Sequence, residues 1–249
     1  MFIVWGKKHV RKNIGYAADF CPICRAPQAF RLVRVGLAGH VYYITSGDGE
    51  LLSHERECLQ CNTLFNADPA WYHTLSQKWQ SLAELIKTTF PNLSEVYKDR
   101  LELAEKIIKT PALLTPQERA SMIRIPFHLL SPLVERRMAQ THIDLGISLA
   151  LVGSIFFISI VPALLMKILP FDEGLIFLAC AITALLGIGW QVLTAGNRYV
   201  KRRIIPVLGP SLKPLRPTES ELKTALAELK ADRQKMATRL SIADLQKYL

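Results

Sequence analysis

Two long segments without charge place the strongest limit on how this chain can fold. Leu145–Met166 has 22 residues and Gly174–Thr194 has 21, and neither contains Asp, Glu, Lys or Arg. As α-helices they measure about 33 and 31 Å, which matches the thickness of a bilayer's hydrocarbon core. The link between them contains Pro170 and two acidic residues. We therefore predict a two-span transmembrane helical hairpin within residues 143–196, in preference to a pair of buried core helices.

Basic residues lie almost entirely outside this hairpin. The short flanks contain Arg124, Arg136, Arg137, Arg198, Lys201, Arg202, Arg203, Lys213 and Arg216, whereas the link contains only Lys167. Cytoplasmic flanks of membrane spans are enriched in Lys and Arg, so both termini are expected in the cytoplasm. The basic side chains next to the spans are expected to contact anionic lipids, and these are Arg136, Arg137, Lys201, Arg202 and Arg203. Aromatic rings favour the interfaces, which suits Phe171 on the outer side and Trp190 and Tyr199 on the inner side.

Small residues recur every four positions within both spans. They are Gly146, Ala150 and Ser154 in the first span, and Ala179, Thr183 and Gly187 in the second. Such stripes allow close approach of helices. We expect the two helices of one hairpin to pack through them, while a homo-oligomer interface is the alternative.

Four of the five cysteines form two Cys-x-x-Cys pairs, Cys21-Pro-Ile-Cys24 and Cys58-Leu-Gln-Cys61. Each pair can point two thiolates at one ion, and two pairs complete a tetrahedral site suited to structural zinc. The intervening segments Phe30–Val35, His40–Ile44 and Leu51–Cys58 are rich in β-forming residues, which predicts a three-stranded zinc ribbon over residues 1–68. A redox dithiol is the competing interpretation, but neither pair lies in a βαβ pattern.

The start Ile3-Val-Trp-Gly-Lys-Lys8, the two knuckles and the aromatic segment between them resemble the N-terminal module of bacterial zinc-ribbon-family proteins. The resemblance covers about residues 1–68 and implies Cys21, Cys24, Cys58 and Cys61 as metal ligands. It implies a fold but no reaction. Together with the hairpin, it implies location in a bacterial inner membrane.

The rest of the chain is predicted to be mainly helical, with cytosolic helices on both sides of the hairpin. In residues 69–142 we expect one helix from Pro69, with Trp71, Leu75, Trp79, Leu82 and Ile86 on its buried face. The capping box Thr115-Pro-Gln-Glu118 opens another helix, which Pro126 is expected to end. A further helix is expected to begin at Pro132 and to run into the first span.

Two segments follow the second span. Prolines at 206, 210, 214 and 217 predict an extended, basic linker over residues 197–217. A second capping box, Thr218-Glu-Ser-Glu221, opens an amphipathic helix within residues 218–249. The fold class is therefore an integral membrane protein, mainly α with a small β zinc ribbon.

The sequence contains no P-loop, zinc-protease or nucleophile-elbow motif, so we do not expect an enzyme. We expect a membrane-anchored adaptor or assembly subunit that recruits a cytosolic or membrane protein. The alternative is a membrane-tethered nucleic-acid binder that uses Lys7, Lys8, Arg11 and Lys12, with Trp5, Tyr42 and Tyr43 available for stacking. Residues 1–68 contain 8 basic and 6 acidic residues, and four thiolates around one zinc ion would cancel that excess. This balance favours the adaptor.

Overall fold

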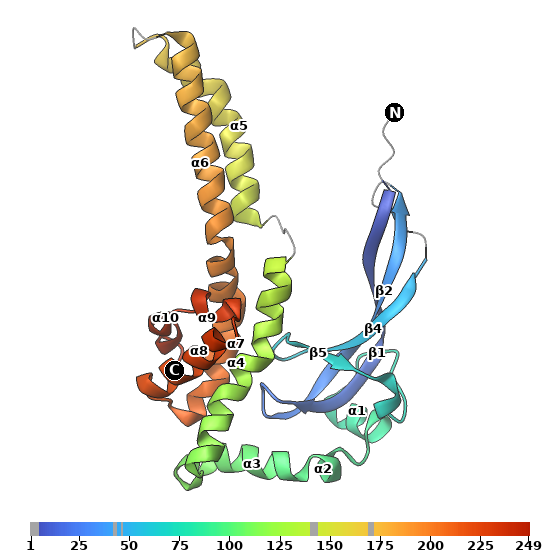
Figure 1. The fold of residues 1–249 in the computed structure, drawn as a ribbon. Coiled ribbons are helices and arrows are strands. Elements are labelled where there is room, and N and C mark those ends of the chain that lie inside the picture. The colour runs from blue at the N-terminus through green and yellow to red at the C-terminus, as the bar shows by residue number, and fades with distance from the viewer. Residues whose placement is uncertain (1–4, 42–43, 46, 140–143, 169–171) are drawn as a thin grey trace. The chain divides into compact units, whose positions relative to one another are not determined.

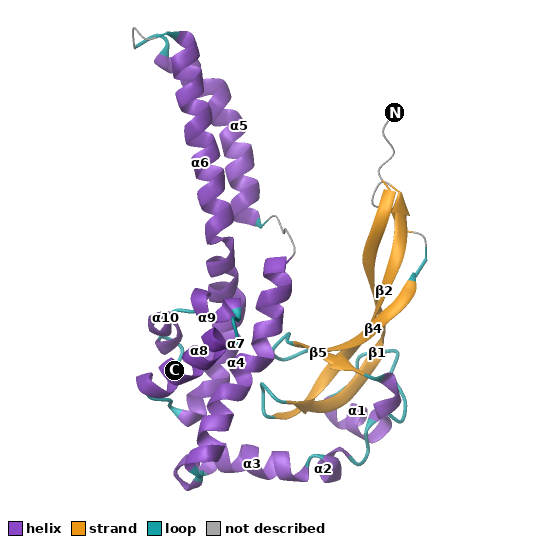
Figure 2. Ribbon diagram, in the orientation of Figure 1, coloured by secondary structure: helices purple, strands orange, loops and turns teal. Residues whose placement is uncertain are grey.

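A computed structural model describes residues 5–41, 44–45, 47–139, 144–168 and 172–249. The chain divides into two compact units, Met1–Leu129 with Pro210–Pro217 and Leu130–Gly209 with Thr218–Leu249. The first unit contains all the strands, and the second contains the two long apolar helices (Figures 1 and 2).

The strands form one antiparallel sheet in the order β1-β2-β4-β5. Its strands are β1 Trp5–Cys21, β2 Ala26–Val41, β4 Glu50–Cys58 and β5 Leu64–Ala67, and the short β3 Ile44–Thr45 pairs with β2. The expected small antiparallel sheet is present, and it is larger than predicted because residues 5–21 form a further strand that we did not predict. Their many basic side chains hide the β pattern, yet β1 pairs with β2 from Trp5 to Cys21. Irregular register at Asn13/Gly15 and at Val35/Gly36 marks bulges in the two long strands.

The prediction of a helix beginning at Pro69 is wrong. Only a 3-10 turn, Pro69–Trp71, forms there, and the first α-helix is α1 Leu82–Thr89, which begins after a capping box at Ser81 and Glu84. Trp71 and Trp79, expected in the core, are 53% and 68% exposed. Asp68 also caps through the Ala70 amide, but the chain then pairs with β1 at Ser76 through two backbone hydrogen bonds to Tyr16. The capping box at Ser81 starts a helix only after this pairing.

Three helices and one 3-10 turn follow: α2 Leu93–Val96, α3 Lys98–Lys109, the turn Pro111–Leu113, and α4 Pro116–Ala139. The capping box at Thr115 and Glu118 is confirmed, but Pro126 does not end α4 and Pro132 does not begin a new helix. Ile123, Phe127, Leu130 and Val134 are all at most 2% exposed. Burial of this continuous apolar stripe offsets the loss of the backbone hydrogen bonds that the prolines cannot make.

The two charge-free segments form α5 Leu145–Leu165 and α6 Glu173–Tyr199, which pack against each other (Figure 1). Both are long and apolar enough to cross a membrane. The continuous helix expected from Pro132 into the first span is not found, because α5 begins afresh after Asp144, which caps it through the Ile147 amide. Phe171, Tyr42 and Tyr43 lie outside the described residues.

The packing face of α6 differs from the predicted stripe. Ile176, Cys180 and Ala184 are buried, whereas Ala179, Thr183 and Gly187 are exposed. On α5, Gly146 faces the Arg198 side chain, which would lie 3.0 Å from an added Cβ atom. The buried stripe of α6 is therefore offset by one position from the predicted one, although Cys180 and Ala184 are still small, and the predicted residues of α5 are half-buried.

The expected extended linker is helical instead. After α6 the chain makes a π-helical turn, Val200–Ile204, then α7 Ile205–Leu212 and a 3-10 turn, Lys213–Leu215. In the π turn the Ile205 amide bonds to the Val200 carbonyl, which shifts the hydrogen-bond register just before Pro206. Ile204, Ile205, Leu208, Leu212 and Leu215 are at most 1% exposed, so packing holds this segment helical.

The C-terminal segment forms three short helices and not the single amphipathic helix we expected. They are α8 Glu219–Ala231, α9 Lys235–Arg239 and α10 Ile242–Gln246. The predicted capping box at Thr218 and Glu221 is confirmed. Asp232 ends α8, and Arg233 has a positive φ of 56°, which turns the chain out of the helix.

Candidate metal centre

The sheet places two Cys-x-x-Cys turns side by side. The first turn closes the β1–β2 hairpin, where Cys21 pairs with Ala26, and the second joins β4 to β5. Phe30 of β2 lies opposite Cys58 of β4, and the Leu59 amide bonds to the Ala29 carbonyl at 3.0 Å. Pairing of the central strands therefore brings the two turns together.

The turns share one backbone design. The Arg25 amide bonds to the Cys21 carbonyl at 2.7 Å, and the Asn62 amide bonds to the Cys58 carbonyl at 2.8 Å. Arg25 and Asn62, which follow the second cysteine of each turn, have φ values of 54° and 53°. Asn tolerates this left-handed region well, but Arg adopts it only where the surroundings require it.

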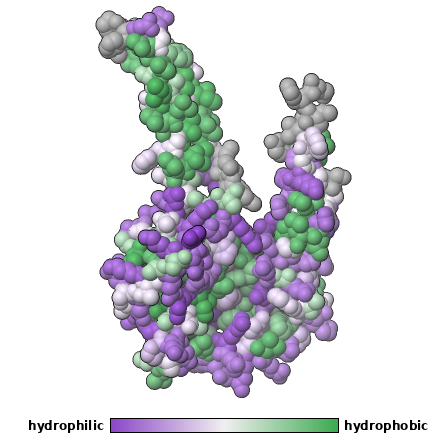
Figure 3. Space-filling model, in the orientation of Figure 1, coloured by the Kyte–Doolittle hydropathy of each residue, from purple (hydrophilic) through white to green (hydrophobic). Residues whose placement is uncertain are grey.

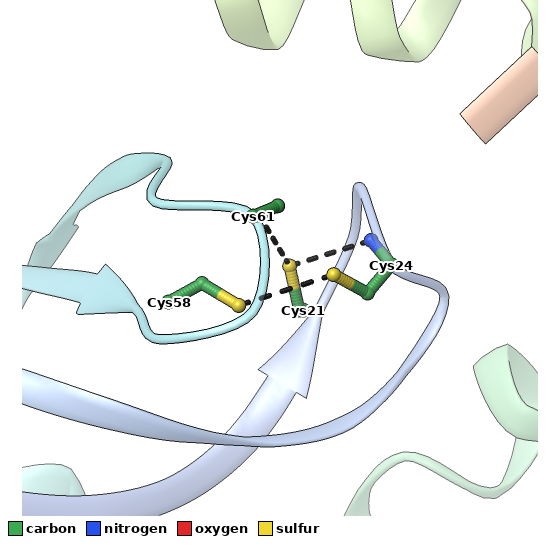
Figure 4. Close-up of side chains that lie close together, drawn as sticks. All are labelled: Cys21, Cys24, Cys58 and Cys61. Atoms are coloured by element: carbon green, nitrogen blue, oxygen red, sulfur yellow. Dashed lines mark hydrogen bonds between the residues drawn. The ribbon is translucent and has the colours of Figure 1, made fainter. Parts of the chain in front are cut away.

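All four sulfur atoms lie within 4.8 Å of one another (Figure 4). Cys21 Sγ is 3.7 Å from Cys61 Sγ, and Cys24 Sγ is 3.9 Å from Cys58 Sγ. Zn–S bonds of about 2.3 Å in a tetrahedron put sulfur atoms about 3.8 Å apart, so the cluster has the dimensions of a four-thiolate zinc site. Four protein ligands leave no open position for a substrate, which is typical of a structural site.

The cluster is shielded and electrostatically coupled. Cys21 and Cys58 are fully buried, and Cys24 and Cys61 are half-buried. The contact with Cys24, followed by the contacts with Cys58 and Cys61 and by burial, raises the pKa of Cys21, whereas contacts with Cys21 and the other two sulfurs lower the pKa of Cys61. Four thiolates in such a space repel one another unless a cation lies between them.

A buried ionic cluster supports the sheet beside this centre. Asp19, 1% exposed, accepts a hydrogen bond from the Tyr72 hydroxyl at 2.6 Å and forms an ion pair with Arg56. The Arg56 guanidinium also lies over the rings of Phe30 and Trp71, at 5.1 and 5.6 Å from their centroids. Burial raises the pKa of Tyr72 to about 12. No local sequence pattern indicates this cluster, because its members are far apart in the chain.

Arg25 is a further buried cation, and it is not among the site residues that we predicted. It is 9% exposed, and its Nη2 donates to the Met122 carbonyl at 3.1 Å. Burial lowers the pKa of Arg25 to about 10, which leaves it charged at neutral pH. Its Nη1 atom is buried without a hydrogen-bond partner among the described residues.

The basic residues considered for nucleic-acid binding divide into two groups. Arg11 pairs with Glu55 at 2.6 Å, and Lys12 pairs with Asp48 at 2.6 Å. Lys7 and Lys8 are exposed near the other end of β1, close to Trp5, which is 81% exposed. The structure thus pairs half of the predicted cations with carboxylates, one in β4 and one in the segment between β3 and β4.

The residues expected to contact lipid also differ in their surroundings. Arg136, Lys201, Arg202 and Arg203 are exposed, whereas Arg137 is half-buried with its guanidinium 5.7 Å from the Tyr199 ring centroid. Lys201 also pairs with Asp244 at 3.2 Å. Arg202 and Arg203 lie in the π-helical turn that follows α6.

Neither a protein-family model, nor a curated protein, nor a solved structure matches this chain.

Proposed function

We propose that this protein is a membrane-anchored adaptor or assembly subunit with a structural zinc ion. In this proposal α5 and α6 span the membrane, and both termini lie in the cytoplasm of a bacterial cell. The zinc-stabilised sheet and the adjoining helices then present a surface to a protein partner. Our proposal includes no catalytic residue.

The exposure of the long helices supports membrane insertion. Only 11% of the most apolar window of α5 and 17% of that of the helix beginning at Glu173 are buried. Leu149, Ile155, Leu185 and Leu186 are each more than 60% exposed, and apolar residues cover the visible face of the hairpin (Figure 3). Soluble proteins rarely expose apolar surface over this length, whereas lipid covers it at no cost.

The main support for the adaptor is that most Arg and Lys side chains of the sheet form ion pairs or hydrogen bonds with nearby carboxylates and carbonyls. Besides the pairs of Arg11 and Lys12, Arg31 pairs with Glu57, and Arg34 donates to the carbonyls of Asp48 and Gly49 at 2.7 and 2.8 Å. Binding to nucleic acid needs cations that are available to phosphates. A sheet in which most of the cations have partners within the chain is better suited to a protein partner.

Exposed aromatic surface on the same unit supports this choice. Trp71 and Trp79 are more than half exposed, and Trp is among the residues enriched in the centres of protein interfaces. These two side chains are the first candidates for contact with the partner.

A salt titration separates the adaptor from the alternative. The full-length protein in nanodiscs of zwitterionic lipid is mixed with single- and double-stranded oligonucleotides over a range of salt concentrations. We expect only weak binding near physiological salt, and we expect it to be the same when Lys7, Lys8, Arg11 and Lys12 are all replaced with Gln. The matched control replaces the four exposed lysines Lys78, Lys87, Lys98 and Lys109 with Gln. Submicromolar binding that is lost in the first variant but not in the second would favour the tethered nucleic-acid binder.

A second experiment tests recruitment directly. Proteins cross-linked to the chain in its native membrane are compared between wild type, Trp79→Ala and Cys58→Ser. We expect a defined partner with wild type that is reduced in Trp79→Ala and lost in Cys58→Ser, while both variants stay in the membrane fraction. A partner set that is identical in all three proteins would contradict the adaptor.

A further inference from the structure

A cavity of about 340 Å³ in the first unit is not explained by the metal centre. The end of β1 and the first knuckle form one wall with Phe20, Pro22 and Arg25, and α3 and α4 form the others with residues that include Ala104, Ile107 and Met122. Its volume falls within the range of pockets that hold small ligands, about 300–1,000 Å³.

The cavity walls are apolar, with two exceptions of the same charge. Phe20, Ala104 and Ile107 are at most 5% exposed. Arg25 and Arg100 are the charged residues among the lining residues that the structure describes, and no acidic residue lines the cavity there. Positive charge in an apolar cavity without an acidic partner favours an anionic ligand.

Arg25 provides the specific contact. Its side chain is more than nine-tenths buried, Nη2 is fixed by the Met122 carbonyl, and Nη1 has no acceptor within the described part of the chain. An unpaired N–H of a buried guanidinium is costly, and a carboxylate or phosphate is the acceptor that an arginine fork fits best. Because Nη1 is itself buried, its contact with a head group requires the Arg25 side chain to turn toward the cavity.

The exposed side chains Arg100 and Ile125 lie at the rim of the cavity. The Arg100 guanidinium lies 5.5 Å from the centroid of the Tyr97 ring, and no ion pair involves it among the described residues. A ligand therefore has an open, positively charged approach and an apolar interior.

We propose that this cavity binds a single-chain anionic amphiphile, with its carboxylate or phosphate head on Arg25 and its hydrocarbon chain against α3 and α4. The binding site is independent of the adaptor proposal, because all its residues belong to the first unit. A free fatty acid and a single-chain phospholipid share the chemistry that the cavity recognises.

Equilibrium dialysis of the zinc-loaded, full-length protein in zwitterionic nanodiscs tests the proposal. Radiolabelled decanoate is the probe, and empty nanodiscs give the background from partition into lipid. We expect about one saturable equivalent above this background. Decanol lacks the charge and acetate lacks the chain, so the affinity of each should be at least about tenfold lower than that of decanoate. Decyl phosphate replaces decanoate in a parallel series, which decides between the two head groups.

Variants assign the binding to the cavity. Arg25→Asn removes the charge but keeps a residue that tolerates positive φ, and we expect about tenfold weaker binding of decanoate. Arg216→Asn is the matched control, because Arg216 also has a positive φ, 43°, but is exposed and does not line the cavity. Ala104→Leu keeps the charge and reduces the space, and it should weaken decanoate binding even if Arg25→Asn does not fold.

Three results would overturn the proposal. The first is the absence of saturable decanoate binding to wild type. The second is decanol or acetate binding as tightly as decanoate. The third is an Arg25→Asn variant that binds decanoate as tightly as wild type, since Arg25 would then not hold the head group.

Discussion

Arg198 holds Asp144 through two nitrogen atoms, with Nε 3.1 Å from Oδ2 and Nη2 3.1 Å from Oδ1. Arg198 lies near the end of α6, and Asp144 caps the start of α5, where the Ile147 amide donates to Oδ1 at 2.9 Å. One carboxylate therefore closes the base of the hairpin and starts its first helix.

Substitutions at Asp144 separate these two roles. Asp144→Asn keeps a good N-cap but removes the ion pair, so we expect a loss of about 1–2 kcal/mol of unfolding free energy. Asp144→Ala removes both and should cost about 1 kcal/mol more. The two losses are measured by titrating the protein with denaturant in mild detergent and monitoring unfolding by circular dichroism. Equal losses would show that the cap contributes nothing.

Acid should weaken the same contact. The backbone hydrogen bond from Ile147, followed by the contact with Arg198, lowers the pKa of Asp144 below its ordinary value of 3.8. The stabilisation is therefore fully present above the unfolded pKa, and it is lost as pH falls through the lower pKa of the folded state. Denaturation midpoints measured between neutral pH and acid should show a step in wild type that Asp144→Asn lacks. The same acid step in both proteins would assign it to other carboxylates.

Removal of the metal should unfold the sheet and leave the hairpin intact. We expect about one zinc ion per chain, and we expect chelation to expose the backbone of residues 5–67, because so small a sheet depends on its metal. Hydrogen exchange followed by mass spectrometry should show fast exchange there and continued protection in α5 and α6. Cys58→Ser should behave like the chelated protein, whereas Cys180→Ser should behave like wild type. Less than about half an equivalent of metal would contradict the proposal.

The Tyr72 hydroxyl should contribute more to the free energy of unfolding than an exposed tyrosine hydroxyl does. Tyr72→Phe leaves the buried Asp19 carboxylate without one of its donors, so we expect a loss of about 1–3 kcal/mol of unfolding free energy. The change in unfolding free energy is measured from the hydrogen-exchange rates of the backbone amides in the sheet. Tyr248→Phe is the control, since Tyr248 is 45% exposed, and it should change stability little. Similar effects of both substitutions would mean that the Asp19 cluster does not stabilise the sheet.

Chemical labelling tests the orientation of the hairpin. In a Cys180→Ala background, Glu173→Cys at the start of α6 should react with an impermeant thiol reagent added outside sealed cells, and Lys247→Cys should not. Inverted vesicles should give the opposite pattern. Reaction of Lys247→Cys in sealed cells would place the C-terminus outside.

Local signals in the sequence predicted the parts of the fold that local interactions determine. The capping boxes at Thr115 and Thr218 mark helix starts that the structure confirms, and the two charge-free segments correspond to α5 and α6. The paired spacing of Cys21, Cys24, Cys58 and Cys61 predicted a cluster of four cysteines, and the structure places their sulfur atoms where they could hold a metal ion.

Predictions that depended on tertiary packing were the ones that failed. Pro126 and Pro206 are poor helix residues, but buried neighbours keep the chain helical around both. The strand Trp5–Cys21 contains few apolar alternations, and pairing with β2 holds it extended. Arg25 and Arg56 could not be recognised in advance, because burial and distant partners give them their roles.

The length of β1 has a mechanical consequence. The nine residues from Trp5 to Asn13, beyond the bulge at Gly15, extend about 30 Å at about 3.3 Å per residue. A swing of about 20° at the bulge would displace Trp5 by about 10 Å, whereas electrostatic influence fades over about 8 Å at physiological salt. The bulge is the irregular point of this paired strand, so a small change of angle there would move the Trp5 end much further than the cysteine end.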